Sequence, residues 1–166
     1  MDTAADQTDL TQDFRSAMRR VASSVFVITC RQGEAHLGMT ASSVVSVSMD
    51  PPSLLVCINR AASIRDAVRD SLLFCVNLLA EGQGEIGAAF GGQLSAAERF
   101  AVGEWIEGAE GLRHLAGAAA SMLCRLEAEI DYGTHTICVG RVTRIELPTM
   151  RSPLLYHNGR FANLPG

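Results

Sequence analysis

The sequence predicts a mainly β protein, an antiparallel barrel with short flanking helices. Roughly seven short β-prone segments are separated by turn signals, and few stretches have helical periodicity. Residues 124–131 alternate between apolar and charged side chains, which is typical of a strand with one wet face. Asn158 and Gly159 stand between two further β-prone runs, a pair that signals a tight hairpin. Many short strands with few helices favour a closed barrel.

The first half of the chain begins with a helix. Thr11 can cap it, and Phe14, Met18 and Val21 then fall on one face. Pro51 and Pro52 cannot donate ladder hydrogen bonds and therefore end a strand. The expected strands are 24–31, then 37–48 after a turn at Gln32-Gly33, then 53–59.

The second half predicts short helices around longer strands. Residues 63–71 have helical spacing, and 72–79 are a nearly continuous apolar run, as in a buried strand. Residues 81–90 and 95–100 predict short surface helices. The strand at 124–131 is followed by a strand at 136–147, irregular near Gly140, and by the hairpin at 154–161.

Length and composition indicate one globular domain. A chain of 166 residues with 48% hydrophobic and 19% charged residues can bury a sufficient core. We expect a flexible tail over residues 1–12 and a single domain over residues 13–166. No apolar run has the length of a signal peptide or a membrane span, so we expect a cytoplasmic protein.

Charge and cysteine usage exclude several classes of partner. The net charge is −4 and no basic run exceeds Arg19-Arg20, which argues against nucleic acid and against an anionic membrane. Any anion site must therefore be local. The five cysteines are widely spaced and lack a Cys-x-x-Cys pair, so we expect reduced, small hydrophobic residues. They are Cys30, Cys57, Cys75, Cys124 and Cys138.

One glycine motif is misleading. Residues 82–87 fit Gly-x-Gly-x-x-Gly after an expected strand, which is the context of a dinucleotide-binding turn. Glu81 and Glu85 nevertheless stand where a pyrophosphate would bind, and the alternating βαβ pattern is missing. We interpret the segment as a glycine-rich surface helix.

Two groups of small and polar residues predict a site for a phosphorylated ligand. Residues 38–43 and 57–63 carry hydroxyls and small side chains on expected neighbouring strands. Arg60 can bind phosphate bidentately, and Ser63 begins a helix whose free N–H groups favour an anion. Taken singly, each hydroxyl is better explained as an ordinary polar side chain on a half-exposed strand, and Ser63 as a helix cap. Their combination favours a phosphate-bearing ligand that lies along a strand.

Several segments carry a family resemblance over nearly the whole chain from Asp13 to Phe161. They are Asp-Phe-Arg-x-Ala-Met at 13–18, Gly-x-Thr-Ala-Ser-Ser at 38–43, Ser-Val-Ser-x-x-Pro-Pro at 46–52, Asn-Arg at 59–60 with Ser63, Phe-Cys-Val-Asn-Leu-Leu at 74–79, Ala-Glu-Arg-Phe at 97–100, Gly-x-His at 133–135 and Leu-x-Tyr at 154–156. Together they resemble the flavin reductase-like, FMN-binding split-barrel family associated with two-component monooxygenases.

The resemblance implies a fold, a reaction and partners. The fold is an antiparallel split β-barrel, and the protein is a homodimer. The reaction is hydride transfer from NADH or NADPH to FMN or FAD, after which reduced flavin diffuses to a partner flavin-dependent monooxygenase. Two alternatives remain open, namely an FMN-bound reductase of another acceptor, such as a corrin cobalt or an aromatic compound, and a flavin- or haem-binding barrel without turnover.

The resemblance also implies roles for individual residues. The isoalloxazine and ribityl chain are lined by the segment around Thr40, and the ribityl and phosphate end is held around Arg60. Phe90 closes over the flavin, and Tyr156 borders the nicotinamide side. The cofactor-binding residues implied are Met39, Thr40, Ala41, Ser42, Ser43, Cys57, Asn59, Arg60, Ser63, Phe90 and Tyr156.

His135 is the candidate catalytic group. From the residues alone, a lone histidine at a strand start is better explained as a structural hydrogen-bonding residue. The resemblance favours a group that positions the nicotinamide or supplies a proton to reduced flavin. The four histidines have no metal-ligand spacing, so no metal site is expected. All basic residues are arginine, whereas relatives often place a lysine near the flavin phosphate, and Arg60 or Arg99 would have to replace it.

Overall fold

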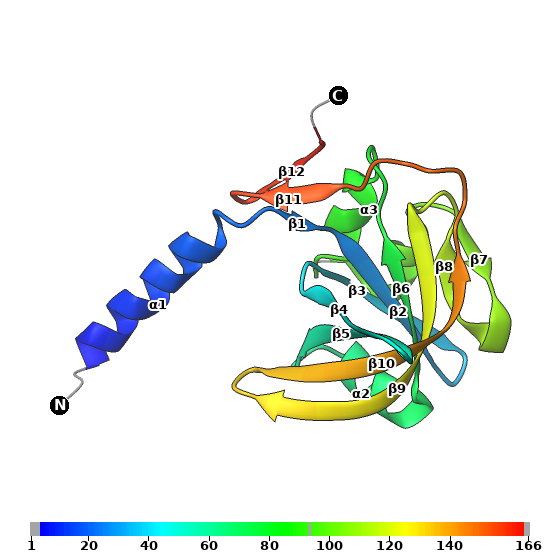
Figure 1. Ribbon diagram of the computed structural model, residues 1–166, viewed down its shortest axis with the longest axis horizontal. Coiled ribbons are helices and arrows are strands. Elements are labelled where there is room, and N and C mark those ends of the chain that lie inside the picture. The colour runs from blue at the N-terminus through cyan, green and yellow to red at the C-terminus, as the bar shows by residue number, and fades with distance from the viewer. Residues whose placement is uncertain (1–3, 93, 165–166) are drawn as a thin grey trace.

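The computed structural model describes residues 4–92 and 94–164, and its centre is an antiparallel sheet of seven strands rolled into a barrel (Figure 1). Every strand pair within this sheet is antiparallel, which confirms the predicted fold class. The strands, in their order across the sheet, are β3 (Ala35–Ala41), β2 (Phe26–Gln32), β6 (Leu73–Leu78), β9 (Ala120–Tyr132), β10 (His135–Glu146), β5 (Pro52–Asn59) and β4 (Val44–Met49).

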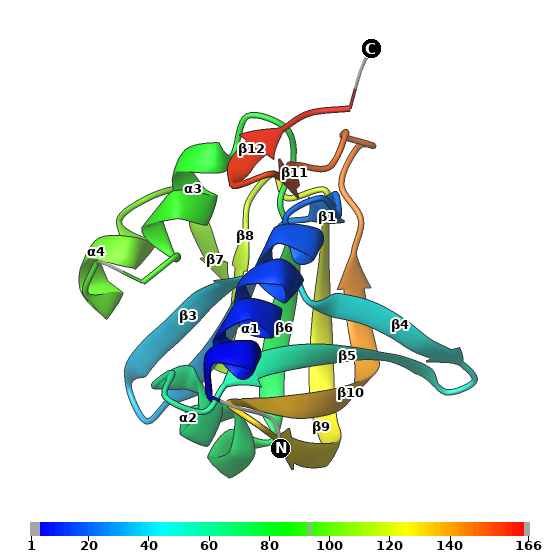
Figure 2. The same cartoon turned by 90° about the vertical axis from the view of Figure 1, so that its left-hand side faces the viewer.

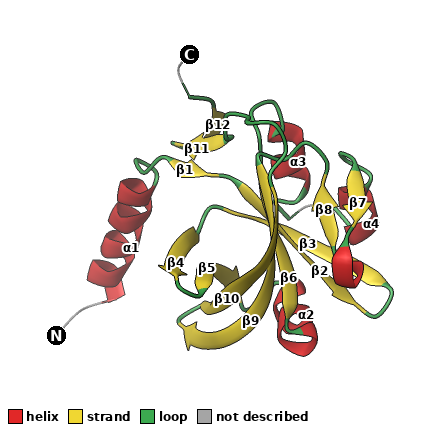
Figure 3. Cartoon of the chain, turned by 45° about the vertical axis from the view of Figure 1, so that its right-hand side comes forward, coloured by secondary structure: helices red, strands yellow, loops and turns green. Residues whose placement is uncertain are grey.

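The barrel closes where the strand pattern is interrupted between β3 and β4. β3 and β4 lie at opposite edges of the sheet, yet only Ser42 and Ser43 separate them in sequence. The N–H of Cys57 on β5 donates to the carbonyl of Ser43 at 3.2 Å. The expectation of one strand over residues 37–48 is therefore wrong, because the chain must leave one edge and join the other for the barrel to close. Figure 3 shows the curved strands that this closure produces.

The barrel interior is one of two hydrophobic clusters. Val56, Ile58 and Phe74 are completely buried there, and α2 (Ile64–Ser71) covers one end with its apolar face. The ring of Phe74 lies against Gly140, where any Cβ would collide with it. The β9–β10 register shifts at this glycine, which confirms the predicted irregularity and lets the strand bend over the core.

The second cluster lies under two short helices, α3 (Gly84–Ala89) and α4 (Ala96–Phe100). Phe90 is its centre and packs against Phe100 and Trp105 with ring centroids 5.1 Å apart in each case. Ser95 and Glu98 form a capping box that starts α4, and the short helix predicted over residues 95–100 is confirmed. The ribbon β7 (Trp105–Glu107) and β8 (Arg113–Leu115), with the 3-10 turn η1 (Ala109–Gly111), has no counterpart in the sequence-based expectation.

A small separate sheet joins the two ends of the chain. It contains β1 (Ser23–Ser24), β11 (Leu155–His157) and β12 (Arg160–Ala162). Asn158 and Gly159 at the turn have φ angles of 50° and 79°, the left-handed values that a two-residue hairpin turn requires. The predicted hairpin is therefore confirmed.

The helix α1 (Ala4–Met18) projects away from the barrel (Figures 1 and 2). It starts well before Thr11, so the expected helix start at Thr11 is wrong; residues 1–3 lie outside the described part. Its apolar face is open to solvent, with Phe14 and Met18 63% and 50% exposed. The division into a tail and a domain stays a prediction. No helix in the described residues is long and apolar enough to span a bilayer.

All five cysteines are unpaired thiols, as expected. Burial raises the pKa of Cys75 and of Cys124 to about 12, and the pKa of Cys138 to about 11. These three thiols are therefore protonated at neutral pH, and they act as small apolar side chains rather than as nucleophiles.

Candidate functional site

A cavity of about 410 Å³ opens between the end of β3, helix α3 and the β11–β12 hairpin. We call it the ring cavity. Its side chains are mostly small on one wall, whereas Tyr156 and Phe161 form an aromatic pair on the other, with centroids 5.6 Å apart. The lining residues are Val25, Thr40, Ala41, Ser42, Gly87, Ala88, Gly91, Tyr156, Gly159, Arg160 and Phe161.

Hydrogen bonds hold the walls of this cavity in place. The hydroxyl of Thr40 donates to the carbonyl of Gly87 at 2.6 Å, and the N–H of Thr40 donates to the carbonyl of Phe90 at 3.0 Å. A Cβ on Gly87 would lie 3.0 Å from Cζ of Phe161. Strand, helix and hairpin are therefore fixed against one another before any ligand binds.

The two residues between β3 and β4, which we call the strand break, supply open hydrogen-bond donors, and the first of them, Ser42, lines the ring cavity. Ser42 and Ser43 are exposed and belong to no strand. Their N–H groups and hydroxyls make no hydrogen bond to any residue that the structure describes. Because a backbone N–H needs a partner, these groups can donate to the carbonyl oxygens and ring nitrogens of a bound heterocycle.

A second group of candidate residues lies at the turn between β9 and β10. His135 is opposite Asn59 in the β5–β10 ladder, and its Nδ1 is hydrogen bonded to the hydroxyl of Thr134 at 2.9 Å. Arg60 donates from its backbone N–H to the carbonyl of Thr134 at 2.9 Å, and from Nη1 to the carbonyl of Gly133 at 3.3 Å. We call Asn59, Arg60 and His135 the hairpin group.

The remaining candidates lie between these groups or in the core. Cys57 is joined to Ser43 by the hydrogen bond across the strand break, so it links the two groups. Ser63 precedes α2 and is exposed, and its hydroxyl makes no capping bond. The predicted role of Ser63 in binding a ligand stays a prediction.

Two of the implied contact residues do not line the ring cavity, and their roles stay predictions. Phe90 does not close over the cavity, because its ring is only 1% exposed and fills the cluster with Phe100 and Trp105. Met39 packs against the barrel core. Alternate side chains of a strand point to opposite faces, so Met39 turns inward where Thr40 turns toward the cavity.

His135 and Tyr156 are not brought together as the resemblance implies. Tyr156 lines the ring cavity, whereas His135 does not and lies with the hairpin group. The role of His135 stays a prediction. Sequence reasoning missed the cavity residues on α3 and β12, of which Phe161 could have been found, because the Asn158-Gly159 hairpin pairs it with Tyr156.

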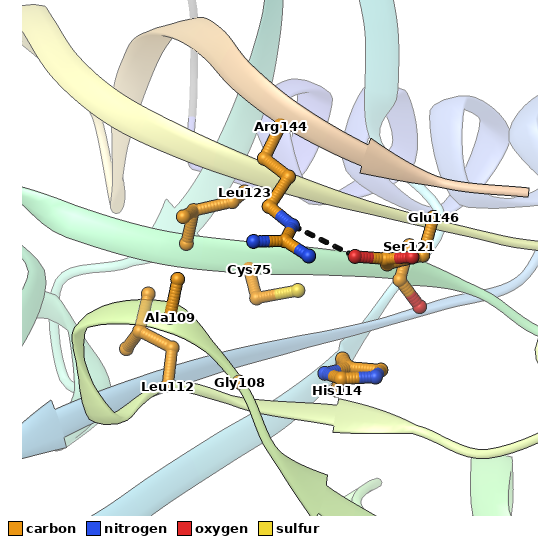
Figure 4. A pocket seen from close by; sticks show the side chains of 9 residues that line it. All are labelled: Cys75, Gly108, Ala109, Leu112, His114, Ser121, Leu123, Arg144 and Glu146. Carbon is orange, nitrogen blue, oxygen red and sulfur yellow. Dashed lines mark hydrogen bonds and ion pairs between the residues drawn. The ribbon is translucent and has the colours of Figure 1, made fainter.

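A separate, smaller hollow has a volume of about 60 Å³, which is too small for a nucleotide (Figure 4). An ion pair between Arg144 and Glu146, at 2.8 Å, lies across it, and the thiol of Cys75 is beside them. The guanidinium is neutralised and the thiol is protonated, so the hollow holds water at most.

The comparison with protein families decides the assignment. The model described as "Flavin reductase like domain" matches residues 18–165. The chain belongs to the flavin reductase-like family. This confirms the sequence-based expectation of a flavin reductase, an oxidoreductase with a split-barrel fold.

Individual relatives of this flavin reductase support the assignment. The chain is 41% identical over 152 residues to the reductase component of an FADH2-dependent resorcinol hydroxylase from Rhizobium sp. strain MTP-10005, covering 90% of this chain and 85% of the relative. It is 39% identical over 152 residues to an FMN reductase (NADH) from Pseudomonas syringae pv. syringae, covering 92% and 85%.

Solved structures agree with the fold. The flavin reductase component of a bacterial two-component tryptophan halogenase superposes with a TM-score of 0.85 at 32% identity, covering 94% of this chain and 99% of that one. The NADH:FAD oxidoreductase of Streptomyces globisporus C-1027, in complex with NAD and FAD fragments, gives a TM-score of 0.87 at 29% identity, covering 93% of each chain.

Proposed function

We propose that this chain transfers hydride from a reduced nicotinamide nucleotide to FMN or FAD, and that the flavin ring binds in the ring cavity. The observation that supports the proposal is the strand break, where Ser42 lines that cavity and its N–H and hydroxyl have no hydrogen-bond partner among the described residues. Neutral donors suit the carbonyls of an isoalloxazine, and no charged group needs to be buried with it.

The cavity fits a flat heterocycle. Its volume of about 410 Å³ lies in the range of small-molecule pockets. Ala41 and Ala88 leave room for a ring to approach the backbone, while Tyr156 offers an aromatic face from the opposite wall. Bound flavin supplies the electron acceptor. The chain orients the two rings and excludes water, which is most of what hydride transfer needs from a protein.

The hairpin group is proposed to hold the phosphate end of the flavin. Arg60 and Asn59 are exposed there, and among the described residues the Arg60 guanidinium donates only to the carbonyl of Gly133. The hydroxyl of Ser63 is available at the start of α2. His135 stands opposite Asn59, where it can position the nicotinamide or hold a proton for the reduced flavin.

Relatives support the choice of donor and of partner. The P. syringae relative and the S. globisporus enzyme are both named for NADH, so NADH is proposed as the donor here. The resorcinol hydroxylase and tryptophan halogenase relatives are components of two-protein systems. Reduced flavin is accordingly proposed to diffuse from this chain to a flavin-dependent monooxygenase.

A homodimer is proposed as the working form. The apolar face of α1 is exposed through Leu10, Phe14 and Met18, and a lone helix of this length is marginal in water. Val45 and Val47 on edge strand β4 are 57% and 51% exposed. A second copy of the chain can cover both surfaces, and Phe14→Glu should then convert the dimer to a monomer in analytical ultracentrifugation.

An anaerobic titration tests the function. The purified protein is mixed with FMN or FAD and titrated with NADH or NADPH while the absorbance of oxidised flavin is followed. Bleaching at one equivalent supports the reductase. NADH oxidation that free flavin does not stimulate favours another acceptor, and binding of flavin without bleaching favours a barrel without turnover; either result would overturn the proposal.

A further inference from the structure

We propose that Arg15 and Arg19 of α1 bind the diphosphate of the nicotinamide dinucleotide in a second cavity that adjoins the ring cavity. This inference rests on the proposed function, because it assigns a place to one of the two substrates. We call the second cavity the α1 cavity. Neither arginine was singled out as a binding residue by the sequence.

The α1 cavity is large enough for half of a dinucleotide. It has a volume of about 580 Å³ and lies between the last turns of α1, the strand break and the turn of the β11–β12 hairpin. Its lining residues are Arg15, Met18, Arg19, Val21, Ser23, Ser42, Ser43, Tyr156, Asn158 and Gly159. Ser42, Tyr156 and Gly159 also line the ring cavity, so one ligand can extend through both.

The β11–β12 hairpin fixes the position of Arg19. The N–H of Asn158 donates to the carbonyl of Arg19 at 2.9 Å, which ties the end of α1 to the turn. A Cβ on Gly159 would lie 3.0 Å from Nη2 of Arg19, so the guanidinium lies directly over this glycine. The left-handed φ of 79° at Gly159 also disfavours a side chain there. The charged group is therefore held at the junction of the two cavities.

The two guanidinium groups lack a counter-charge. Neither forms an ion pair within 4.0 Å of a carboxylate among the side chains of residues 9–92 and 94–164. Arg15 is in the last turn of α1 and Arg19 directly follows the helix, with its N–H donating to the carbonyl of Arg15 at 3.0 Å, so the two like charges are one turn apart and repel each other. An anion in the cavity would relieve this repulsion, and arginine matches phosphate oxygens bidentately. The hydroxyls of Ser23 and Ser43 add neutral donors beside the charges.

The reaction itself separates the two phosphate sites. Flavin and nicotinamide rings must stack face to face, so their phosphorylated tails leave the reacting centre by different routes. Asn59 and Arg60 lie at the end of β5, beside the β9–β10 turn, and are proposed to bind the phosphorylated tail of the flavin. The α1 cavity continues from the aromatic side of the ring cavity, past Tyr156. It therefore serves the second substrate.

Steady-state kinetics of Arg15→Gln, Arg19→Gln and the double variant test the assignment, with riboflavin as the acceptor. Riboflavin carries no phosphate, so any phosphate contact that is lost belongs to NADH. We expect KM for NADH to rise by about tenfold for each change, with kcat nearly unchanged, since the lost contact is made equally before and during hydride transfer. Arg15→Lys with Arg19→Lys should restore part of the affinity.

Arg20→Gln is the matched control. Arg20 lies just after the end of α1 but does not line the α1 cavity. Its substitution should therefore leave KM for NADH and KM for riboflavin unchanged. An unchanged KM for NADH in the double variant would overturn the inference. So would a rise in KM confined to FMN, with riboflavin and NADH unaffected, because it would assign the arginines to the flavin phosphate.

Calorimetry with ADP-ribose separates this inference from the proposed function. ADP-ribose carries the diphosphate but no nicotinamide, and it should bind to the wild type at least about tenfold more tightly than to the double variant. Wild-type protein that reduces no flavin would end the proposed function, whereas a loss of ADP-ribose affinity in the double variant would still support the arginine site. Equal affinities would overturn it even in an active reductase.

Discussion

The ring cavity and the hairpin group differ in how firmly the fold holds them. Thr40, on the cavity wall, lies opposite Val27 on β2, and Val27 lies opposite Asn77 on β6. That row is backed by a completely buried hydrogen-bond network. The hairpin group lies on exposed strand ends and is held by contacts with the backbone of one turn. The comparison indicates a rigid, preformed ring cavity and a hairpin group that is held less firmly.

The network behind the ring cavity is centred on one side chain. Asn77 donates to the carbonyl of Val27 at 3.0 Å, and its Oδ1 accepts from the N–H of Leu115 and the hydroxyl of Ser121, each at 2.9 Å. This amide joins β2, β8 and β9. Strand β8, which no sequence pattern predicts, is attached to the barrel through it.

Asn77→Ala should have the largest effect on stability. The change leaves the buried partner groups on Val27, Leu115 and Ser121 without a hydrogen bond, which costs about 3 kcal/mol or more of unfolding free energy. Asn59→Ala is the matched control: Asn59 is exposed, and among the described residues its side chain accepts only from the N–H of Ala61, at 2.9 Å. Urea denaturation checks both. Equal losses of unfolding free energy in the two variants would contradict the inference that the ring cavity is held more firmly than the hairpin group.

His135→Ala tests whether the hairpin group takes part in turnover. We expect kcat to fall by about tenfold while the flavin dissociation constant changes little, because a positioning or proton-holding group acts mainly on the hydride-transfer step. Stopped-flow reduction and flavin fluorescence measure the two quantities. Thr134→Val removes the hydroxyl that is hydrogen bonded to the imidazole and should have a smaller effect. An unaltered rate would remove His135 from the mechanism.

Local sequence patterns predicted most elements and a closed barrel, but not the position at which the barrel closes. Alternation, proline stops and the Asn158-Gly159 pair identify strands because each acts within a few residues. The break at Ser42 has no local signal, since it follows from the closing of a sheet whose edges β3 and β4 are adjacent in sequence. The orientation of Phe90 has no local signal either, since the packing against Phe100 and Trp105 decides where its ring points.

Thr40→Val tests whether the rigidity of the ring cavity matters for binding. The substitution keeps the shape but removes the hydroxyl that donates to the carbonyl of Gly87 at 2.6 Å. We expect a loss of about 1 kcal/mol of unfolding free energy. KM for flavin should rise a few-fold while KM for NADH is unchanged, because α3 loses its tie to the wall. Ser16→Ala, which removes an exposed hydroxyl on α1, is the control. Unchanged flavin affinity would show that this tie is not needed.

The smallest expected effect is a pH dependence of stability that arises beside the hairpin group, at Asp131. Asp131 accepts a hydrogen bond from the hydroxyl of Thr136 at 2.5 Å and pairs with Arg65 at 3.3 Å; the hydroxyl first, and then the guanidinium, lower the pKa of this carboxyl. A lowered pKa stabilises the fold above the unfolded-state value of about 3.9, and this stabilisation disappears as pH falls through the folded-state value.

Asp131→Asn should therefore lower the urea midpoint at pH 7 slightly, and the difference from wild type should shrink toward about pH 3. The loss caused by Thr40→Val should be the same at both pH values, since its hydrogen bond joins two neutral groups. A loss in Asp131→Asn that does not vary with pH would show that the carboxyl acts through its shape and not through its charge. The two regions would then differ in rigidity alone.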